Sequence, residues 1–207
     1  MKKACHIIGA GDFTPELLEI NENDIVIACD GGLAPLLSAG ITVDYCIGDF
    51  DSLGEIPTGD FKLTVLPKEK DVTDTHAACS LAMEMGYTTL RLYGMLGGGR
   101  FSHSVANLQL ISSLAESGLD VRIIDRSCTV YALADRGIDF SENQRGYVSV
   151  FSFSEQAVCT CRGLKYEIED HPLTSRFPLG VSNELVGCAG QVIFKKGVGI
   201  VIFEEKY

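Results

Sequence analysis

Short apolar runs alternate with helical patterns over the first 125 residues of this 207-residue chain, and this alternation restricts the fold more than any other feature. The apolar runs, which are the candidate strands, are residues 4–8, 25–29, 45–47, 62–66, 89–93 and 121–124. Most are continuously apolar, which is typical of strands that are covered on both faces. Strands that alternate with helices predict right-handed βαβ units and a mostly parallel, Rossmann-like sheet with flanking helices.

Two segments between these strands have the spacing of amphipathic helices. Residues 75–85 and 104–117 carry apolar side chains at helical intervals, and each is followed by a glycine, Gly86 and Gly118. Glycine just past the last apolar position is a common C-terminal signal, because it adopts left-handed backbone freely. We therefore expect both segments to be helices of an α/β domain.

From about Ser127 the helical patterns stop and closely spaced strands follow. These candidate strands are residues 129–134, 147–153, 157–162, 190–195 and 199–203. Their period-two alternation, broken by Gly, Asn and Ser turns, predicts a small all-β sandwich. We therefore expect two domains, an α/β domain of residues 1–125 and a β-sandwich domain of residues 126–207.

The chain is acidic, with 28 Asp and Glu against 17 Lys and Arg and a net charge of -11. Such a charge repels phosphate backbones and anionic lipids unless a local basic patch overrides it, and we find no such patch. The apolar run before Asp12 is too short for a signal peptide, and no run reaches the roughly 18 residues of a membrane span. We expect no nucleic-acid partner, no membrane partner and a cytoplasmic location.

The sequence contains eight cysteines but no CxxC motif. Six of them stand singly among other residue types, whereas Cys159 and Cys161 have the i, i+2 spacing that places both on one face of a strand. The favoured interpretation is that all eight are reduced and act as small hydrophobic residues. Zinc binding or redox chemistry at Cys159 and Cys161 is the alternative.

Polar side chains follow the predicted strands at the edge where ligands bind in parallel sheets. Asp49 and Asp51 follow the third strand, and Asp71 and Asp74 follow the fourth. Carboxylates gathered this closely repel one another unless a cation neutralises them. Mg²⁺ binds such oxygens and keeps positions open for water and substrate phosphates. A single aspartate is most simply a solvated surface group, but the four together predict a magnesium site.

A glycine-rich loop, residues 94–100, precedes the second predicted helix and ends in Arg100. It is not a P-loop, because Arg100 replaces the lysine and Phe101 replaces the Ser or Thr of that motif. Backbone N–H groups at a helix N-terminus bind anions, and arginine presents a planar fork to phosphate. A flexible turn with a solvated arginine is the alternative. His103 is the only histidine we consider for the site, and Asn107 lies one helical turn beyond it.

Six segments occur in an order and spacing that together are highly specific. They are Asp30-Gly31-Gly32, residues 48–52 (GDFDS), the set Asp71, Thr73 and Asp74, Gly98-Gly99-Arg100 with His103 and Asn107, residues 163–166 (GLKY) and residues 179–184 (LGVSNE). With these segments the chain resembles the thiamin pyrophosphokinase (thiamine diphosphokinase) family over nearly its whole length. GDFDS alone is moderately specific, and the ordered set is strongly so.

The resemblance implies transfer of the diphosphate group of ATP to the hydroxyl of thiamine, giving thiamine diphosphate and AMP with Mg²⁺ required. It implies that residues 1–125 form the catalytic, nucleotide- and metal-binding domain. Residues 126–207 would then bind thiamine and dimerise, in a homodimer whose sites lie between the subunits.

The resemblance also assigns roles to particular residues. The metal and catalytic carboxylates are Asp49, Asp51, Asp71 and Asp74, with Arg100 as a catalytic phosphate binder. The nucleotide-site residues are Asp30, Gly31, Gly98, Gly99, Arg100, Ser102, His103 and Asn107, and the thiamine-site residues are Ser182 and Asn183. These roles fit phosphoryl-type transfer, which is catalysed mainly by positioning and charge neutralisation.

One position departs from the family pattern, because Ser102 stands where the family usually has Asp. We expect Ser102 to precede a helix that starts near His103 and to act as its N-cap. The alternative is that its hydroxyl contacts the nucleotide or a metal-bound water. The chain also lacks Trp, so we expect a Phe or Tyr, such as Phe177, to stack on thiamine.

Two other functions fit parts of the sequence. The Asp49-Phe50-Asp51 segment suggests a phosphohydrolase with an aspartyl nucleophile, although that chemistry usually places a Thr where this chain has Leu53. The other is a thiamine- or nucleotide-binding protein without turnover, for which Ser102 is the only hint in the sequence.

Overall fold

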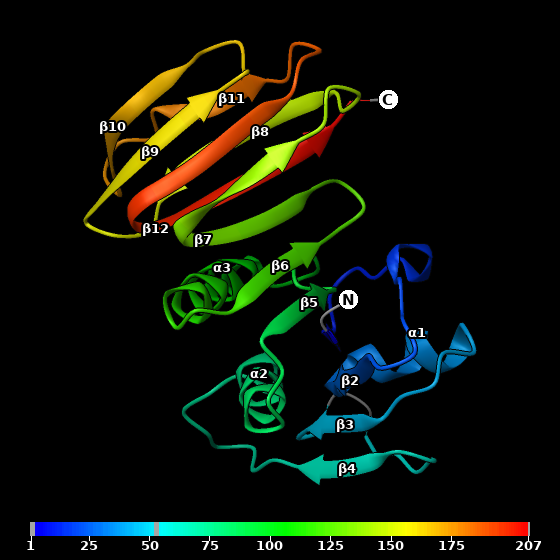
Figure 1. Cartoon of the computed structure of the whole chain (residues 1–207). Coiled ribbons are helices and arrows are strands. Elements are labelled where there is room, and N and C mark those ends of the chain that lie inside the picture. The colour runs from blue at the N-terminus through cyan, green and yellow to red at the C-terminus, as the bar shows by residue number, and fades with distance from the viewer. Residues whose placement is uncertain (1–2, 52–53, 207) are drawn as a thin grey trace. The chain divides into compact units, whose positions relative to one another are not determined.

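The computed structural model describes residues 3–51 and 54–206, which divide into two compact units (Figure 1). The first unit comprises Met1–Asn107 and Ile123–Arg126, and the second comprises Leu108–Arg122 and Ser127–Tyr207. Two elements, α3 (Phe101–Glu116) and β6 (Asp120–Ile124), are each divided between the units. Among the described residues, no helix is long and apolar enough to cross a bilayer.

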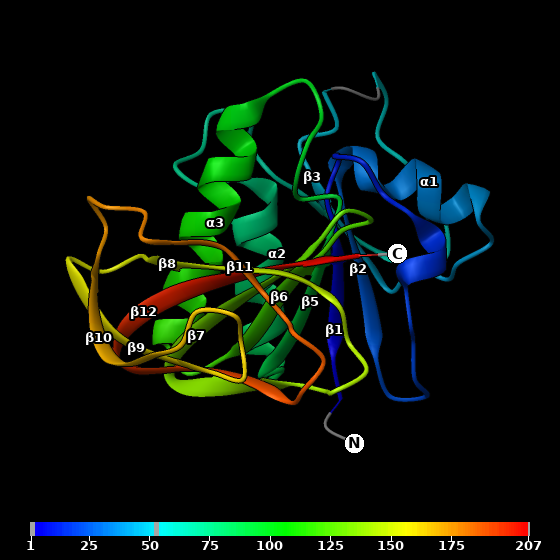
Figure 2. The ribbon, with the colours of Figure 1, turned by 90° about the horizontal axis from the view of Figure 1, so that it is seen from above.

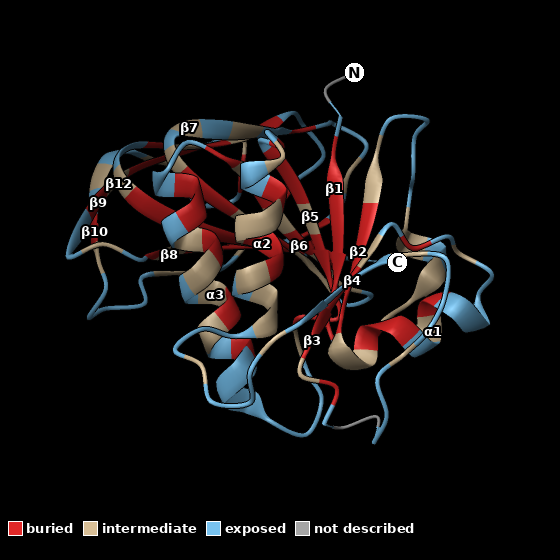
Figure 3. Cartoon of the chain, turned by 90° about the horizontal axis from the view of Figure 1, so that it is seen from below, coloured by how far each residue is buried: buried red, intermediate tan, exposed pale blue. Residues whose placement is uncertain are grey.

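The first unit is built on parallel strands. In spatial order they are β5 (Thr89–Tyr93), β1 (Cys5–Ile8), β2 (Ile25–Cys29), β3 (Tyr45–Gly48) and β4 (Lys62–Val65). The interior strands β1 and β2 are almost wholly buried, as the apolar runs predict (Figure 3). All four residues of β4 are exposed, because it lies at the edge of this set of strands.

Helices cover both faces of these strands (Figure 2). On one face, α1 (Leu33–Ser38) buries Leu33 and Leu36 against Ile8 and Val26. On the other face, α2 (Asp74–Glu84) buries Ala78, Cys79 and Ala82 and contacts β1, β2 and β3. The two predicted helices are found as α2 and α3, and α3 starts three residues before the predicted position. Helix α1 and the short 3-10 turns Pro15–Leu17 and Asp30–Gly32 were not predicted from the sequence.

A buried polar network ties β1 to the loop before β2. The His6 ring lies between Asp24 and Tyr93, with its Nε2 3.3 Å from Asp24 Oδ2 and its Nδ1 3.3 Å from the Tyr93 hydroxyl. The Asp24 carboxylate also accepts hydrogen bonds from the backbone of Ala4 and Asn21. Burial alone would raise the pKa of Asp24, but these hydrogen bonds outweigh it and lower the pKa from 3.8 to about 2.

The Asp24 network predicts loss of stability in acid. The carboxyl titrates near 3.8 in the unfolded chain and near 2 in the folded one, so its contribution is present above pH 4 and is lost as the pH falls through 2. The difference in pKa corresponds to about 2 kcal/mol. We expect the free energies of unfolding of wild type and Asp24→Asn, measured in urea, to converge as the pH is lowered from 6 toward 2. A constant difference between them would contradict this prediction.

The second unit contains the antiparallel strands. They are β7 (Thr129–Phe140), β8 (Gly146–Ser152), β9 (Gln156–Arg162), β10 (Ile168–Thr174), β11 (Gly180–Glu184) and β12 (Gly190–Glu205). Strand β12 pairs with β7, β8 and β9, while β10 pairs with β9 and β11 pairs with β8. Their shared core includes Val148, Phe194, Val201 and both Cys159 and Cys161.

Two expectations for the strands of this unit were wrong or incomplete. The strands expected at residues 190–195 and 199–203 are one strand, β12, whose register with β7 shifts between Phe194 and Val198. Gly197 lies in this irregular stretch with a φ of 73°. Glycine is also a turn signal in a sequence, which is why two strands were expected. Strands β10 and β11 were not predicted, because their exposed, polar residues carry no clear apolar alternation. All eight cysteines are free of disulfides, as expected, and six are buried, but Cys128 is only partly buried and Cys188 is exposed, so these two do not act as core residues.

Candidate functional site

The loops that follow β1 and β5 meet where the strand order of the first unit reverses. Strand β1 pairs with β2 on one side and with β5 on the other, which is the position where open α/β sheets bind ligands. Gly11 N donates to Gly94 O at 2.9 Å. A Cβ atom on Gly9 would lie 2.7 Å from the same carbonyl oxygen, so this close approach requires glycine.

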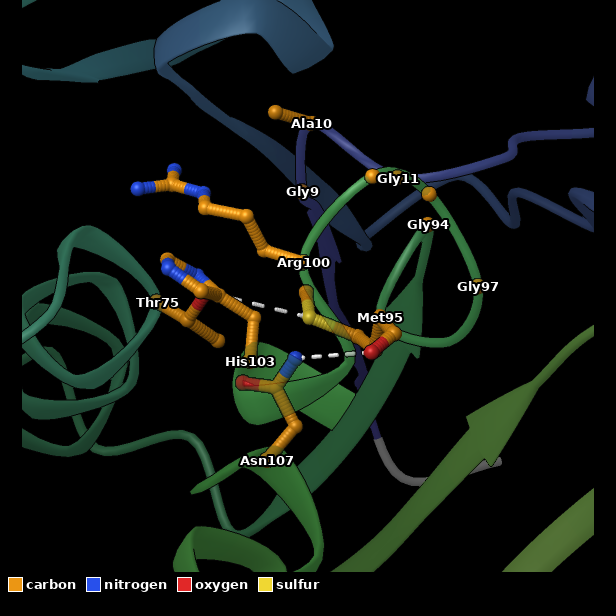
Figure 4. Close-up of a pocket in the computed structure, with 12 residues that line it drawn as sticks. Gly9, Ala10, Gly11, Thr75, Gly94, Met95, Gly97, Arg100, His103 and Asn107 are labelled. Atoms are coloured by element: carbon orange, nitrogen blue, oxygen red, sulfur yellow. Dashed lines mark hydrogen bonds between the residues drawn. The ribbon is translucent and has the colours of Figure 1, made fainter. Parts of the chain in front are cut away.

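A small pocket of about 110 Å³ opens between these loops (Figure 4). Its lining includes the glycine-rich loop with Gly98 and Gly99, and the side chains of Arg100, His103 and Asn107. Asn107 is buried, and its Nδ2 donates to Met95 O at 2.8 Å, which holds the loop against α3. The structure therefore brings together the glycines, the arginine, the histidine and the asparagine that the sequence analysis selected.

A larger pocket of about 610 Å³ shares Arg100 and His103 with the small one. Its acidic lining residues are Asp30, Asp49, Asp51 and Asp74. The predicted gathering of carboxylates at the ends of the strands is therefore present for these residues. Asp71 is exposed and is not among the residues that line this pocket, so the structure does not bring it together with the other aspartates.

The Asp49-Phe50-Asp51 turn explains why two carboxylates separated by one residue line the same pocket. Phe50 is only 2% exposed and packs in the core cluster that contains Ile8 and Val26. Its backbone has a φ of 56°, a left-handed conformation that is rare for a bulky residue and is typical of strained functional turns. The backbone N–H of Asp51 donates to Asp49 Oδ1 at 3.3 Å. The buried ring therefore anchors the turn while both carboxylates line the pocket.

Two lysines that the sequence analysis did not select neutralise these carboxylates. Lys70 Nζ lies 2.9 Å from Asp49 Oδ2 and 2.7 Å from Asp74 Oδ1, and Lys68 Nζ lies 2.5 Å from Asp51 Oδ1. The hydrogen bond from Lys70 is the main reason that the pKa of Asp49 is lowered. Burial alone would lower the pKa of Lys70, but its bonds to Asp74 and Asp49 raise it. The sequence signal for this pairing was the alternation of lysines with acidic residues at 68–71.

The donor set suits a hard cation such as Mg²⁺, because the carboxylate oxygens of Asp49, Asp51 and Asp74 line one open pocket. Over residues 3–51 and 54–206, no three His, Cys, Asp or Glu side chains lie close enough to form a complete metal cage by themselves. Mg²⁺ typically takes only one or two carboxylates and completes its shell with water and phosphate oxygens. The site therefore fits a magnesium ion that is bound together with a phosphate-bearing substrate.

The predicted position of Ser102 before its helix is wrong. Helix α3 begins at Phe101, so Ser102 is the second residue of its first turn and does not occupy the N-cap position. The backbone N–H of His103 donates to Arg100 O at 3.0 Å, which confirms that the turn is already formed there.

We expect Ser102→Ala to change the free energy of unfolding by less than about 0.5 kcal/mol, as is usual for exposed positions away from special features. The turnover rate should change by less than about tenfold, because Asp49, Asp51 and Asp74 remain in the pocket. Thermal melts and steady-state kinetics on this variant test both statements. A hundredfold loss of turnover would instead mean that the hydroxyl contacts the nucleotide or a metal-bound water.

The predicted thiamine residues lie on β11 in the second unit. The Asn183 side chain is engaged with the 163–166 segment, since its Oδ1 accepts from Tyr166 N at 2.9 Å and its Nδ2 donates to Tyr166 O at 2.7 Å. Ser182 has a φ of 57°, and its N–H donates to Ser149 Oγ at 2.9 Å. The two family-like segments of this unit are thus hydrogen-bonded to each other, and Tyr166 is 64% exposed beside Asn183.

Phe177 lines a separate cavity of about 230 Å³ in the second unit, together with Val150 and Leu173. Phe177 is 66% exposed, and Tyr166 is 64% exposed with Lys165 Nζ 5.8 Å from its ring centroid. Phe177 was named as a stacking candidate from the sequence and Tyr166 was not, although Tyr166 belongs to the GLKY segment on which the resemblance partly rests.

Both units of the chain match known proteins. The family model "Thiamin pyrophosphokinase, catalytic domain" matches residues 17–123, and the model "Thiamin pyrophosphokinase, vitamin B1 binding domain" matches residues 137–199. A thiamine pyrophosphokinase of Bacillus subtilis (strain 168) is 32% identical over 211 residues, covering 97% of this chain and 98% of that protein.

Solved structures show the same similarity over the whole chain. The crystal structure of thiamine pyrophosphokinase from Bacillus subtilis matches with a TM-score of 0.82 and 27% identity, covering 99% of this chain and 100% of that one. The crystal structure of thiamin pyrophosphokinase from Geobacillus thermodenitrificans matches with a TM-score of 0.78 and 27% identity, covering 98% of each chain. The chain therefore has the mixed α/β fold of these structures.

Proposed function

Because this chain belongs to the thiamin pyrophosphokinase family, we propose that it transfers the diphosphate group of ATP to the hydroxyl of thiamine, giving thiamine diphosphate and AMP. Its thiamine pyrophosphokinase activity follows from the two family-model matches and from the 32% identical relative. The match leaves the phosphohydrolase alternative without support. The observation that carries the detailed proposal is the pocket in which three lysine-paired aspartates face Arg100 and His103.

In this reaction the hydroxyl oxygen of thiamine forms a bond to the β-phosphorus of ATP. The bond between that phosphorus and the oxygen bridging it to the α-phosphorus breaks, AMP leaves with this oxygen, and the hydroxyl proton is released. Arg100 and the N–H groups of Gly98 and Gly99 bind the polyphosphate, because they combine a planar cation with backbone donors at the start of α3. These groups hold the chain of phosphates in line for attack.

Asp49, Asp51 and Asp74 hold Mg²⁺ in this proposal, and Asp71 remains a catalytic and metal candidate only through the family resemblance. Bound Mg²⁺ would supply neutralisation of the charge that develops on the transferred group. Asp30 and Gly31 follow β2, and Asp30 lines the same pocket, which supports a role in nucleotide binding together with His103 and Asn107. Ser102, exposed in the first turn of α3, remains a nucleotide contact only in the alternative stated above.

We also propose the finer architecture. Residues 1–125 form a Rossmann-like catalytic domain, and residues 126–207 form a β-sandwich that binds thiamine through Ser182 and Asn183. The match of the vitamin B1 binding model to residues 137–199 supports this assignment. The exposed apolar side chains Phe177, Leu179 and Val181, which are 66%, 49% and 50% exposed, support a homodimer formed through this domain. A cytoplasmic location, as expected from the sequence, remains part of the proposal.

Product analysis tests the proposed reaction. We expect the purified chain with ATP, Mg²⁺ and thiamine to produce AMP and thiamine diphosphate in equal amounts, and chelation of the metal with EDTA to stop both. Formation of ADP in place of AMP would contradict transfer of a diphosphate group. Tight binding of thiamine and ATP without any product would instead support the binding protein that lacks turnover.

A further inference from the structure

The Lys70 ammonium occupies a position between two carboxylates that come from different elements. Asp49 follows β3, and Asp74 is the first residue of α2, where the Thr73 side chain caps the helix by accepting from His76 N. Lys70 Nζ contacts Asp49 Oδ2 at 2.9 Å and Asp74 Oδ1 at 2.7 Å. The lysine side chain is only 13% exposed, so its charge is held inside the pocket and is not screened as a surface charge would be.

Lys68 provides a contrast within the same loop. Among the residues that the structure describes, its one ion pair is with Asp51, and the side chains of this pair are 73% and 50% exposed. Exposed pairs of this kind contribute little, because water and salt screen them. The two lysines are two residues apart, carry the same charge and pair with aspartates of the same pocket. They therefore form a matched pair in which only Lys70 bridges two carboxylates.

From this geometry we infer that Lys70 is an internal counter-cation which a divalent cation must displace from Asp49 and Asp74. The inference rests on the proposed function, in which these carboxylates hold Mg²⁺. A divalent cation and the ammonium would compete for the same carboxylate oxygens and repel each other at contact distance. The displaced ammonium needs another anion, and a polyphosphate in the pocket that Lys70 and Arg100 both line would supply it. Lys70 therefore makes the site bind metal weakly alone and strongly together with the nucleotide.

The first test measures binding of Mn²⁺ alone, by the loss of the free-ion signal in electron paramagnetic resonance. Without nucleotide, we expect Lys70→Met to bind Mn²⁺ at least about tenfold more tightly than wild type. Lys68→Met, the matched control, should stay within about threefold of wild type because its pair is exposed. Lys70→Arg should also stay close to wild type because it retains the charge. A purely structural role for Lys70 would not increase metal affinity, so equal affinities of wild type and Lys70→Met would overturn the inference.

The second test adds α,β-methylene-ATP, in which the bond to be broken is blocked. We expect this analogue to increase Mn²⁺ affinity more in wild type than in Lys70→Met, because only wild type gains a new partner for the displaced ammonium. The same increase in both proteins would contradict the coupling. Thermal melts show whether each variant is folded before it is titrated.

A third measurement needs no variant, so the inference can fail even if Lys70→Met does not fold. In wild type, saturating Mg²⁺ and the analogue should shift the ¹³Cε resonance of Lys70 and leave that of exposed Lys165 unchanged. An unchanged Lys70 resonance would overturn the inference. Failure of wild type to form AMP and thiamine diphosphate from ATP would overturn the proposed function. Equal Mn²⁺ affinities in an active enzyme would overturn only the role of Lys70.

Discussion

Asp49→Asn and Asp51→Asn should each lower the turnover rate about a thousandfold, which is about 4 kcal/mol at about 1.4 kcal/mol per tenfold. Both carboxylates line the pocket with Arg100, where the proposed reaction places the polyphosphate of ATP. Without these charges the metal is held less well, and the developing negative charge of the transferred group is less well neutralised. Steady-state formation of AMP at saturating ATP and thiamine measures the effect.

Asp60→Asn is the matched control for these variants. Asp60 is exposed and lies outside both pockets, so the same change of charge there should leave the rate within about twofold of wild type. Retention of more than a tenth of the wild-type rate by both Asp49→Asn and Asp51→Asn would contradict the assignment of these carboxylates. Restoration of activity by higher Mg²⁺ concentration would support it, because weaker metal binding can be offset by mass action.

Phe50→Ala should have the largest effect on stability among the substitutions considered. Phe50 is 2% exposed in the core of the first unit, and truncation of a buried Phe costs about 3–5 kcal/mol. The left-handed backbone remains unfavourable for Ala, so the variant keeps the strain and loses the packing that compensates for it. We expect the melting temperature to fall by roughly 10 °C for a chain of this size. Urea unfolding gives the change in free energy directly.

Phe101→Ala is the matched control, because it makes the same Phe-to-Ala change at an exposed position. Phe101 is 80% exposed, so this truncation should change the free energy of unfolding by less than about 0.5 kcal/mol. Phe50→Ala should also reduce turnover below the melting range, because the ring anchors the turn that presents Asp49 and Asp51. Equal stability of the two variants would mean that the Phe50 ring contributes no packing energy. Full activity of Phe50→Ala would mean that the carboxylates do not need this anchor.

The sequence by itself determined the elements whose signal is local. Strands β2 and β5 were predicted with the bounds that the structure shows, because each is a continuous run of residues that pack on both faces of a sheet. Helices α2 and α3 were predicted from their apolar spacing and the glycines that follow them. The ordered motifs also identified the family, which the two family models and the 32% identical relative confirm.

Only the tertiary structure decided which side chains meet. Asp30 joins Asp49 and Asp74 because parallel pairing places the ends of β2 and β3 side by side, whereas Asp71 stays outside although it is only three residues from Asp74. Because the Thr73 side chain caps α2, the helix begins at Asp74. Asp74 therefore projects from the helix, whereas Asp71 lies in the loop before it. The bridging position of Lys70 and the engagement of Asn183 with Tyr166 likewise depend on contacts between distant segments. Such contacts leave no periodic pattern in the sequence, because they are set by strand pairing and side-chain direction in three dimensions.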